Sequence, residues 1–148
     1  MADQTKKNIV YQVSIYHLDN QFYVTSMVPM PPIGMSTPVL PVYIVPDNDS
    51  ERFAEVLEAA RGQSNFTFDP KQVKPREEWD GDKERVPNTA QKSWCVFWDE
   101  EGGVIIGFAK PYVKHRKSVE WIFVKDAEKN LLPPVSSHDI AQEILNQV

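Results

Sequence analysis

Histidine and carboxylate side chains are neighbours at two places in the 148-residue sequence, His17-Leu18-Asp19 and His138-Asp139. A carboxylate beside an imidazole can serve acid–base catalysis, but turn and helix-capping roles account for such neighbours more often. We expect His17 in a turn, His138 at a helix start, and the third histidine, His115, in a basic loop. No histidine has a second His or Cys at a metal-binding spacing, so we predict no metal site and no cofactor.

Covalent catalysis has no visible candidate either. Cys95 is the only cysteine, and it lies within an apolar run without a neighbouring cation that would lower its pKa. Gly102-Gly103 follows three acids and lacks the lysine or third glycine of a phosphate cradle. We predict that the protein is not an enzyme. An enzyme whose site is assembled from distant carboxylates and His115 stays as an alternative, because spacing along the chain cannot reveal such a site.

A compact basic stretch, Lys110–Lys117, contains four cations and one aromatic residue. Such a stretch can contact phosphates while the aromatic ring stacks on a base. The net charge of -5 and the pI of about 5.2 instead favour a solvated loop or an edge strand. Nucleic acid is therefore not the expected partner, and a nucleic-acid-binding module remains an alternative. Its binding residues would be Lys110, Tyr112, Lys114, Arg116 and Lys117.

Two acidic segments suit a basic protein partner. One lies in the long polar segment 63–92 and contains a tryptophan, and the other follows the apolar run that contains Cys95. Complementary charge accelerates association, and tryptophan is enriched among the residues that dominate binding energy. The candidate partner-binding residues are Glu77, Glu78, Trp79, Asp80, Asp82, Asp99, Glu100 and Glu101.

The N-terminal half predicts a hairpin, a proline-rich loop, a short strand and a helix. Apolar residues alternate from Ile9 to Ile15 and return at 22–28, which indicates two antiparallel strands. We expect Pro29–Met35 to be a loop, and Val39–Val45 to be a strand with Pro41 at its start or on a sheet edge. A cap at 47–50, followed by apolar residues at helical spacing, predicts a helix that ends at Gly62.

The C-terminal half predicts strands at 94–98, 104–108 and 119–124, and a last helix that begins at a capping Ser136. Separate runs of strands and helices indicate one α+β domain over residues 1–148. We expect a mostly antiparallel sheet of about five or six strands, with two or three helices packed on it. The single cysteine, the absence of an apolar leader and the absence of a stretch of about 18 apolar residues predict a cytoplasmic protein that does not bind membranes.

Five segments of the predicted layout form a pattern: the strand Val42–Pro46, the helix Ser50–Arg61, the strands Ser93–Val96 and Val104–Ile106, and the closing strand–helix unit. This layout resembles the immunity proteins of bacterial contact-dependent growth inhibition systems, over about Val39–Val148. The resemblance implies a cytoplasmic protein that binds and blocks a cognate toxin, often a nuclease, without catalysing a reaction. On this basis we expect the acidic segments to occlude the active site of a basic toxin domain.

Overall fold

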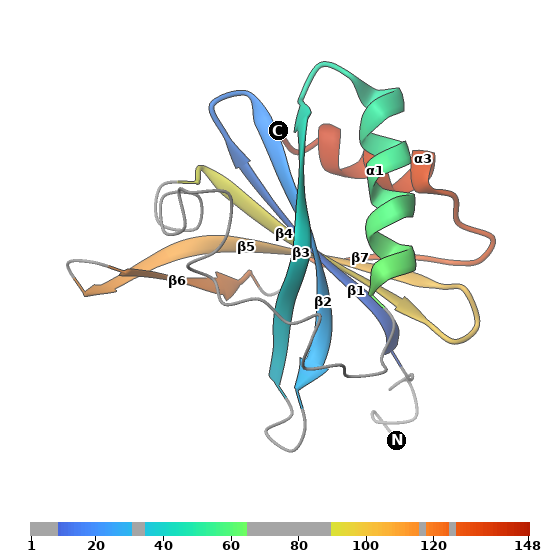
Figure 1. Cartoon of the computed structure of the whole chain (residues 1–148), viewed down its shortest axis with the longest axis horizontal. Coiled ribbons are helices and arrows are strands. Elements are labelled where there is room, and N and C mark those ends of the chain that lie inside the picture. Colours follow the sequence, from blue (N-terminus) through green and yellow to red (C-terminus); the bar gives the residue numbers. More distant parts are fainter. Residues whose placement is uncertain (1–8, 31–34, 65–89, 116–117, 125–126) are drawn as a thin grey trace.

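A computed structural model describes residues 9–30, 35–64, 90–115, 118–124 and 127–148 of the chain. In chain order the elements are β1 (Ile9–Leu18), β2 (Gln21–Met30), β3 (Met35–Pro46), α1 (Ser50–Gln63), β4 (Lys92–Asp99), β5 (Val104–His115), β6 (Ser118–Phe123), β7 (Lys129–Leu131) and α3 (Ser137–Leu145). The strands form one twisted sheet in the order β3-β2-β1-β4-β5-β6, and β7 pairs with β5 (Figure 1). Every pairing is antiparallel, which confirms the predicted α+β class.

The β1–β2 hairpin follows the predicted alternation. Asp19 and Asn20 form its two-residue turn, and both have a positive φ, at 54° and 63°. Asp and Asn tolerate this left-handed backbone better than most residues, and two such residues give the turn a twist that matches the strands. The expectation that His17 lies in the turn is wrong, because His17 pairs with Phe22 inside the ladder.

The proline-rich region forms strand where a loop was expected. Pro29 pairs with Ser36, and Met30 pairs with Met35, so only residues 31–34 lie outside the described strands. The pairing of β1 with β2 ends at Met27, so the missing N–H of Pro29 removes no hydrogen bond between these two strands. Pro41 lies on the edge strand β3, at a register shift, as its missing N–H predicts.

Strand β5 is longer than predicted and changes partners along its length. Its first half pairs with β4 on one side and with β7 on the other. From Ala109 onward it pairs with β6, and this β5–β6 hairpin extends away from the helices in Figure 1. Lys110–His115 therefore belongs to a strand, and the prediction of a basic loop for His115 is wrong.

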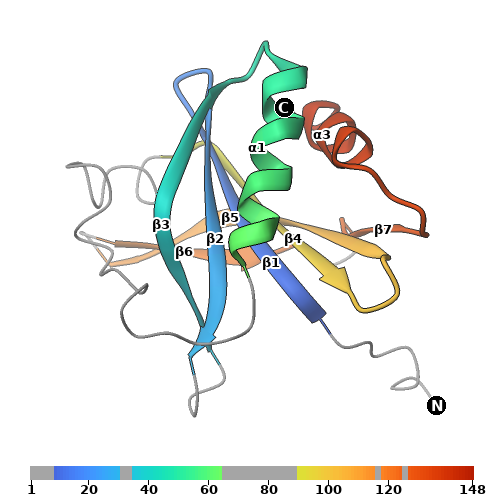
Figure 2. The same ribbon diagram turned by 45° about the vertical axis from the view of Figure 1, so that its right-hand side comes forward.

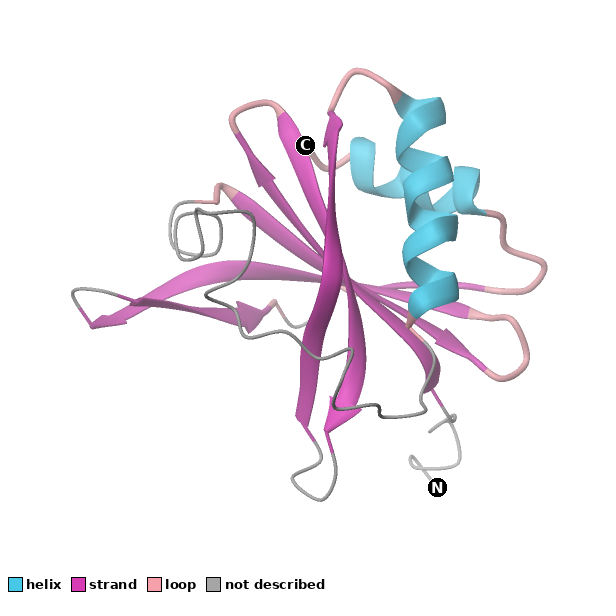
Figure 3. Ribbon diagram, in the orientation of Figure 1, coloured by secondary structure: helices cyan, strands magenta, loops and turns pink. Residues whose placement is uncertain are grey.

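Both described helices cover the same face of the sheet (Figures 2 and 3). Asp49 caps α1 by accepting from the Arg52 amide at 3.0 Å. Phe22 from the sheet stacks on Phe53 from α1, with ring centroids 4.2 Å apart. Because both rings are fully buried, this contact holds α1 against β2. The other large, fully buried side chains include Trp94, Ile15, Leu57, Ile106, Ile140 and Ile144.

Cys95 lies on the opposite face of β4 from the core residue Trp94. Its thiol is within 3.3 Å of the Ser14 hydroxyl, and burial raises the pKa of the thiol above its ordinary value of 9.0. A protonated thiol is a weak nucleophile, so this environment gives Cys95 a packing role.

Candidate protein-binding surface

An acidic stripe runs along the outer side of α1. Glu51, Glu55 and Glu58 recur at intervals of four and three residues, which places them on one helical face, and all three are exposed. The apolar positions Phe53, Val56 and Leu57 turn inward and are buried. The same amphipathic pattern that packs α1 on the sheet therefore presents its carboxylates to solvent.

The N-terminus of α3 lies against the middle of α1. Ser136 and Asp139 cap α3 reciprocally: the Asp139 amide donates to Ser136 Oγ at 3.1 Å, and the Ser136 amide donates to Asp139 Oδ2 at 3.0 Å. The hydrogen bonds from Ser136 hold the pKa of the Asp139 carboxyl below its ordinary value of 3.8. This confirms the predicted cap and gives the helix start its own negative charge.

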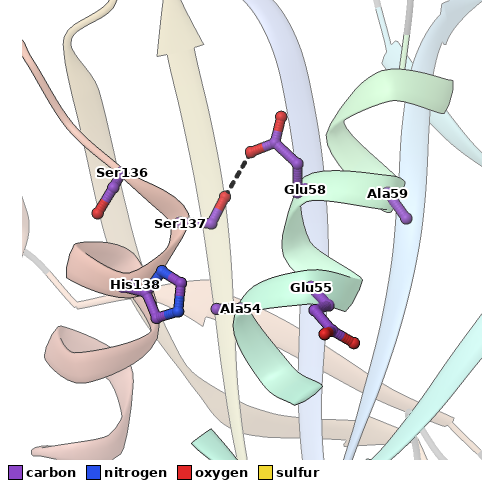
Figure 4. Close-up of a pocket in the computed structure, with 7 residues that line it drawn as sticks. All are labelled: Ala54, Glu55, Glu58, Ala59, Ser136, Ser137 and His138. Carbon is purple, nitrogen blue, oxygen red and sulfur yellow. Dashed lines mark hydrogen bonds between the residues drawn. The ribbon is translucent and has the colours of Figure 1, made fainter. Parts of the chain in front are cut away.

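A shallow hollow of about 610 Å³ lies between these two helices (Figure 4). Ala54 and Ala59 leave it open because their side chains end at Cβ. Ala54 is buried and forms the floor of the hollow, whereas Ala59 is exposed. The residues that line the hollow are Ala54, Glu55, Glu58, Ala59, Ser136, Ser137 and His138.

Glu58 ties the two helices together across the hollow. Ser137 Oγ donates to Glu58 Oε1 at 2.7 Å, and Arg61 Nη1 donates to Glu58 Oε2 at 3.1 Å. The Arg61 guanidinium also lies over the rings of Tyr11 and Trp98, 4.9 and 5.9 Å from their centroids. Both oxygens of Glu58 thus have partners, and its neighbour Arg61 is held in place by two aromatic rings.

The Glu55 side chain is held less firmly than that of Glu58. It forms an ion pair with Arg52, one turn earlier, whose Nη1 donates to Glu55 Oε1 at 3.3 Å. The two side chains are 56% and 68% exposed, and an ion pair of this kind stabilises a helix by only about 0.3–0.5 kcal/mol. Glu55 can therefore change partners at little cost.

The described helical surface carries a strong negative charge. Residues 47–63 and 137–145 contain seven acidic residues and two arginines. Among the described residues, Lys110 and Lys114 of the basic stretch belong to β5, in the part that extends away from the helices in Figure 1. The acidic residues of the helical surface and these two lysines therefore lie on different elements of the fold.

The acidic β4–β5 turn lies beside the segment that leads into α3. A Cβ atom built on Gly102 would lie 3.6 Å from Pro133 Cβ. Glu100 and Glu101 are exposed at this turn, as their predicted role in binding requires. The turn and the hollow therefore occupy one side of the protein.

Asp99 has a structural role within this turn. It is only 7% exposed, and its Oδ1 accepts from the amides of Glu101 and Gly103 at 2.8 and 2.9 Å. These bonds close the hairpin, so the Asp99 carboxylate is turned toward its own backbone. Of the acidic triplet, Glu100 and Glu101 are exposed to solvent and Asp99 is buried.

The other predicted binding residues, Glu77, Glu78, Trp79, Asp80 and Asp82, lie outside the described residues. Their role stays a prediction. The sequence interpretation missed the hollow itself, although the four- and three-residue spacing of the glutamates on α1 was a signal for an exposed acidic face. Nothing in the sequence indicated that the start of α3 would pack beside that face.

The His17 side chain pairs with a carboxylate that is distant in sequence. His17 is buried and its Nε2 lies 2.9 Å from Asp47 Oδ2, so its carboxylate partner is not the neighbouring Asp19. This bond joins β1 to the loop before α1. Across the described ranges, no group of three or more His, Cys, Asp or Glu side chains could hold a metal ion. Within the same ranges, no helix has the length and apolar character to cross a membrane.

No protein-family model matches the chain, and no curated protein matches it in sequence. Among solved structures, the fold is similar to that of the protein of unknown function NMB0488 from Neisseria meningitidis. The TM-score is 0.59 and the sequence identity is 13%, with 93% of this chain and 92% of that chain covered. The similarity extends over nearly the whole fold, so the two proteins share one architecture.

Proposed function

We propose that the protein is an immunity protein that binds a cognate bacterial toxin and blocks its active site. The observation that carries this proposal is the single acidic side formed by the α1–α3 hollow and the β4–β5 turn. An active site that binds a nucleic-acid backbone is rich in Lys and Arg, so a nuclease domain would present the complementary charge. The resemblance to growth-inhibition immunity proteins points to the same class of partner.

Inhibition needs no reaction in this mechanism. The acids raise the association rate by attracting a basic surface from a distance, and they oppose the docking of acidic proteins. Residues that lose all contact with water in the complex would provide most of the affinity, and Trp79 is the predicted anchor of this kind. A role without catalysis stays a prediction that activity assays can test.

The test is a pull-down with the toxin domain encoded next to this gene, followed by calorimetry on the purified pair. Immunity at low toxin concentration requires nanomolar affinity, which corresponds to about 12 kcal/mol of association free energy. Combined replacement of Trp79, Asp80 and Asp82 by alanine should weaken binding, and so should Glu55→Gln. The matched control is Glu128→Gln, which removes one exposed carboxylate at a distance along the chain from both acidic segments.

Absence of binding to any toxin domain encoded beside the gene would overturn the proposal. Protection should also appear in cells. A strain that expresses the toxin domain should survive when it also expresses this protein, and survival that does not depend on the acidic residues would contradict the proposed surface.

A second candidate function is nucleic-acid binding by the β5–β6 hairpin. The observation that favours it is the placement of the stretch from Lys110 to His115 on a hairpin that extends from the sheet. Charge reversal at Lys114 and Arg116 should then abolish a salt-dependent affinity for RNA or single-stranded DNA. Unchanged binding in that assay would exclude this function.

A further inference from the structure

We infer that the α1–α3 hollow receives one cationic side chain, an arginine or lysine, from the protein partner. The inference rests on the proposed function for the identity of the partner. Its chemistry rests on the hollow alone, which combines a small aliphatic floor with carboxylates at its rim. Arginine and lysine have this same composition, because a chain of methylenes carries a charged head.

Glu55 is the carboxylate that would meet the incoming charge. Glu58 already accepts hydrogen bonds at both oxygens, from Ser137 and from Arg61. Glu55 has only the exposed pair with Arg52, so exchanging that partner for a cation of another protein costs little. The two glutamates therefore have different roles: Glu58 fixes the position of α3 against α1, and Glu55 recognises the ligand.

The hollow disfavours an anion. The first turn of a helix ordinarily attracts negative charge, but Asp139 already occupies this position at the start of α3. The amides of Asp139 and Ile140 both donate to Ser136, so they are engaged within the cap. With Glu55 and Glu58 on the facing helix, the local field favours a positive group.

The aliphatic part of the ligand would lie on the alanines. Ala54 is 2% exposed, so it offers a floor without a deep cavity, and the exposed Ala59 adds a second methyl group. Figure 4 shows Glu58 and Ser137 meeting across the space between the two helices, with Ala54 between them and with Glu55 and Ala59 farther from α3 on α1. A side chain that crosses α1 here covers the alanines before its head reaches Glu55.

The test uses a small probe, so that it does not depend on finding the toxin. The ¹⁵N-labelled full-length protein is titrated with the tripeptide acetyl-Gly-Arg-Gly-amide and, separately, with the same peptide carrying citrulline. Citrulline has nearly the same shape as arginine but no charge. We expect saturable shifts of the Ala54, Ala59 and His138 amide signals with the arginine peptide, at a dissociation constant on the order of 1 mM, and much weaker shifts with citrulline.

Three variants locate the binding. Glu55→Gln should weaken the arginine peptide about threefold to fivefold, as expected for a partly exposed ion pair. Ala59→Leu should abolish binding by filling the hollow, and it keeps the net charge and the helix propensity. Glu128→Gln removes the same charge elsewhere and should leave the affinity unchanged.

Equal binding of the two peptides, or an unchanged affinity in Ala59→Leu, would overturn the inference. So would an absence of saturable shifts in a protein that still binds its toxin, and in that case the proposed function would stand. Failure of the toxin assay with a positive peptide titration would instead overturn the proposed function, which distinguishes the two.

Discussion

Replacement of Asp99 by alanine is expected to destabilise the protein more than a substitution in a surface turn usually does. Asp99 Oδ1 accepts two amide hydrogen bonds, at 2.8 Å from Glu101 and 2.9 Å from Gly103. The Glu101 amide lies at the exposed tip and can be solvated in the variant, whereas Gly103 is buried and its amide would lose its partner. The buried amide without a partner and the lost hydrogen bond to a charged acceptor should together reduce the free energy of unfolding by about 2–3 kcal/mol.

The assay is urea unfolding followed by circular dichroism, with thermal unfolding as a second measurement. For a chain of this size, a loss of 2–3 kcal/mol lowers Tm by about 5–10 °C. Asp99→Asn is the matched variant: it keeps an oxygen that can accept both bonds, so its loss should stay within about 1 kcal/mol. The glycine must remain, because a Cβ at position 103 would lie 2.7 Å from Asp99 Oδ2.

This pair of variants also separates structure from recognition. Asp99→Asn removes the charge while it preserves the turn, so affinity for the proposed toxin partner should hardly change if Asp99 is structural. An alanine variant as stable as the wild type would refute the structural role. A large loss of affinity in a stable Asp99→Asn protein would instead indicate that the Asp99 carboxylate takes part in binding.

Three further predictions concern stability and reactivity. Phe53→Ala should reduce the free energy of unfolding by about 3–5 kcal/mol in urea titrations, because it removes a fully buried ring stacked on Phe22, and a loss below 1 kcal/mol would contradict that packing. Asp139→Ala should lower Tm at neutral pH but not in acid. Hydrogen bonds from Ser136 lower the pKa of the Asp139 carboxyl in the folded state. The contribution of the ionised carboxylate to stability is therefore complete above the unfolded pKa of about 3.8, and it disappears as the pH falls through the folded pKa. A Tm difference between wild type and variant that persists at pH 2 would refute this. The Cys95 thiol should react with a disulfide reagent much more slowly in the native protein than in urea, because burial raises its pKa, and equal rates would show that it is accessible.

The sequence predicted elements well and contacts between elements poorly. Alternation located β1 and β2, and capping residues located the starts of α1 and α3, because each signal is contained within a few neighbouring residues. The strand through Pro29 was missed because proline argues against a paired strand, and the exception depends on where the pairing with β1 stops. Periodicity within one strand holds no information about the length of its neighbour.

The candidate site likewise combines a feature that the sequence predicts with features that depend on contacts between elements. The exposed face of α1 could be predicted from Glu51, Glu55 and Glu58, since helical spacing fixes which residues share a face. The hollow could not, because it depends on Ser137 of α3 meeting Glu58 across 79 residues of sequence. The structural role of Asp99 also depends on backbone amides, which a pattern of side chains does not display.

The prolines of β3 have a consequence for how the protein behaves at high concentration. In the described part of the sheet, β3 has a neighbour on only one side, so its other side would ordinarily offer a ladder of hydrogen-bonding groups to any extended chain. Three of its 12 residues are prolines, which carry no N–H, and its pairing with β2 is shifted between Thr25 and Ser26. An approaching strand would meet an interrupted and twisted row of donors. The edge is therefore a poor template for intermolecular β-pairing, which lowers the tendency of concentrated protein to aggregate.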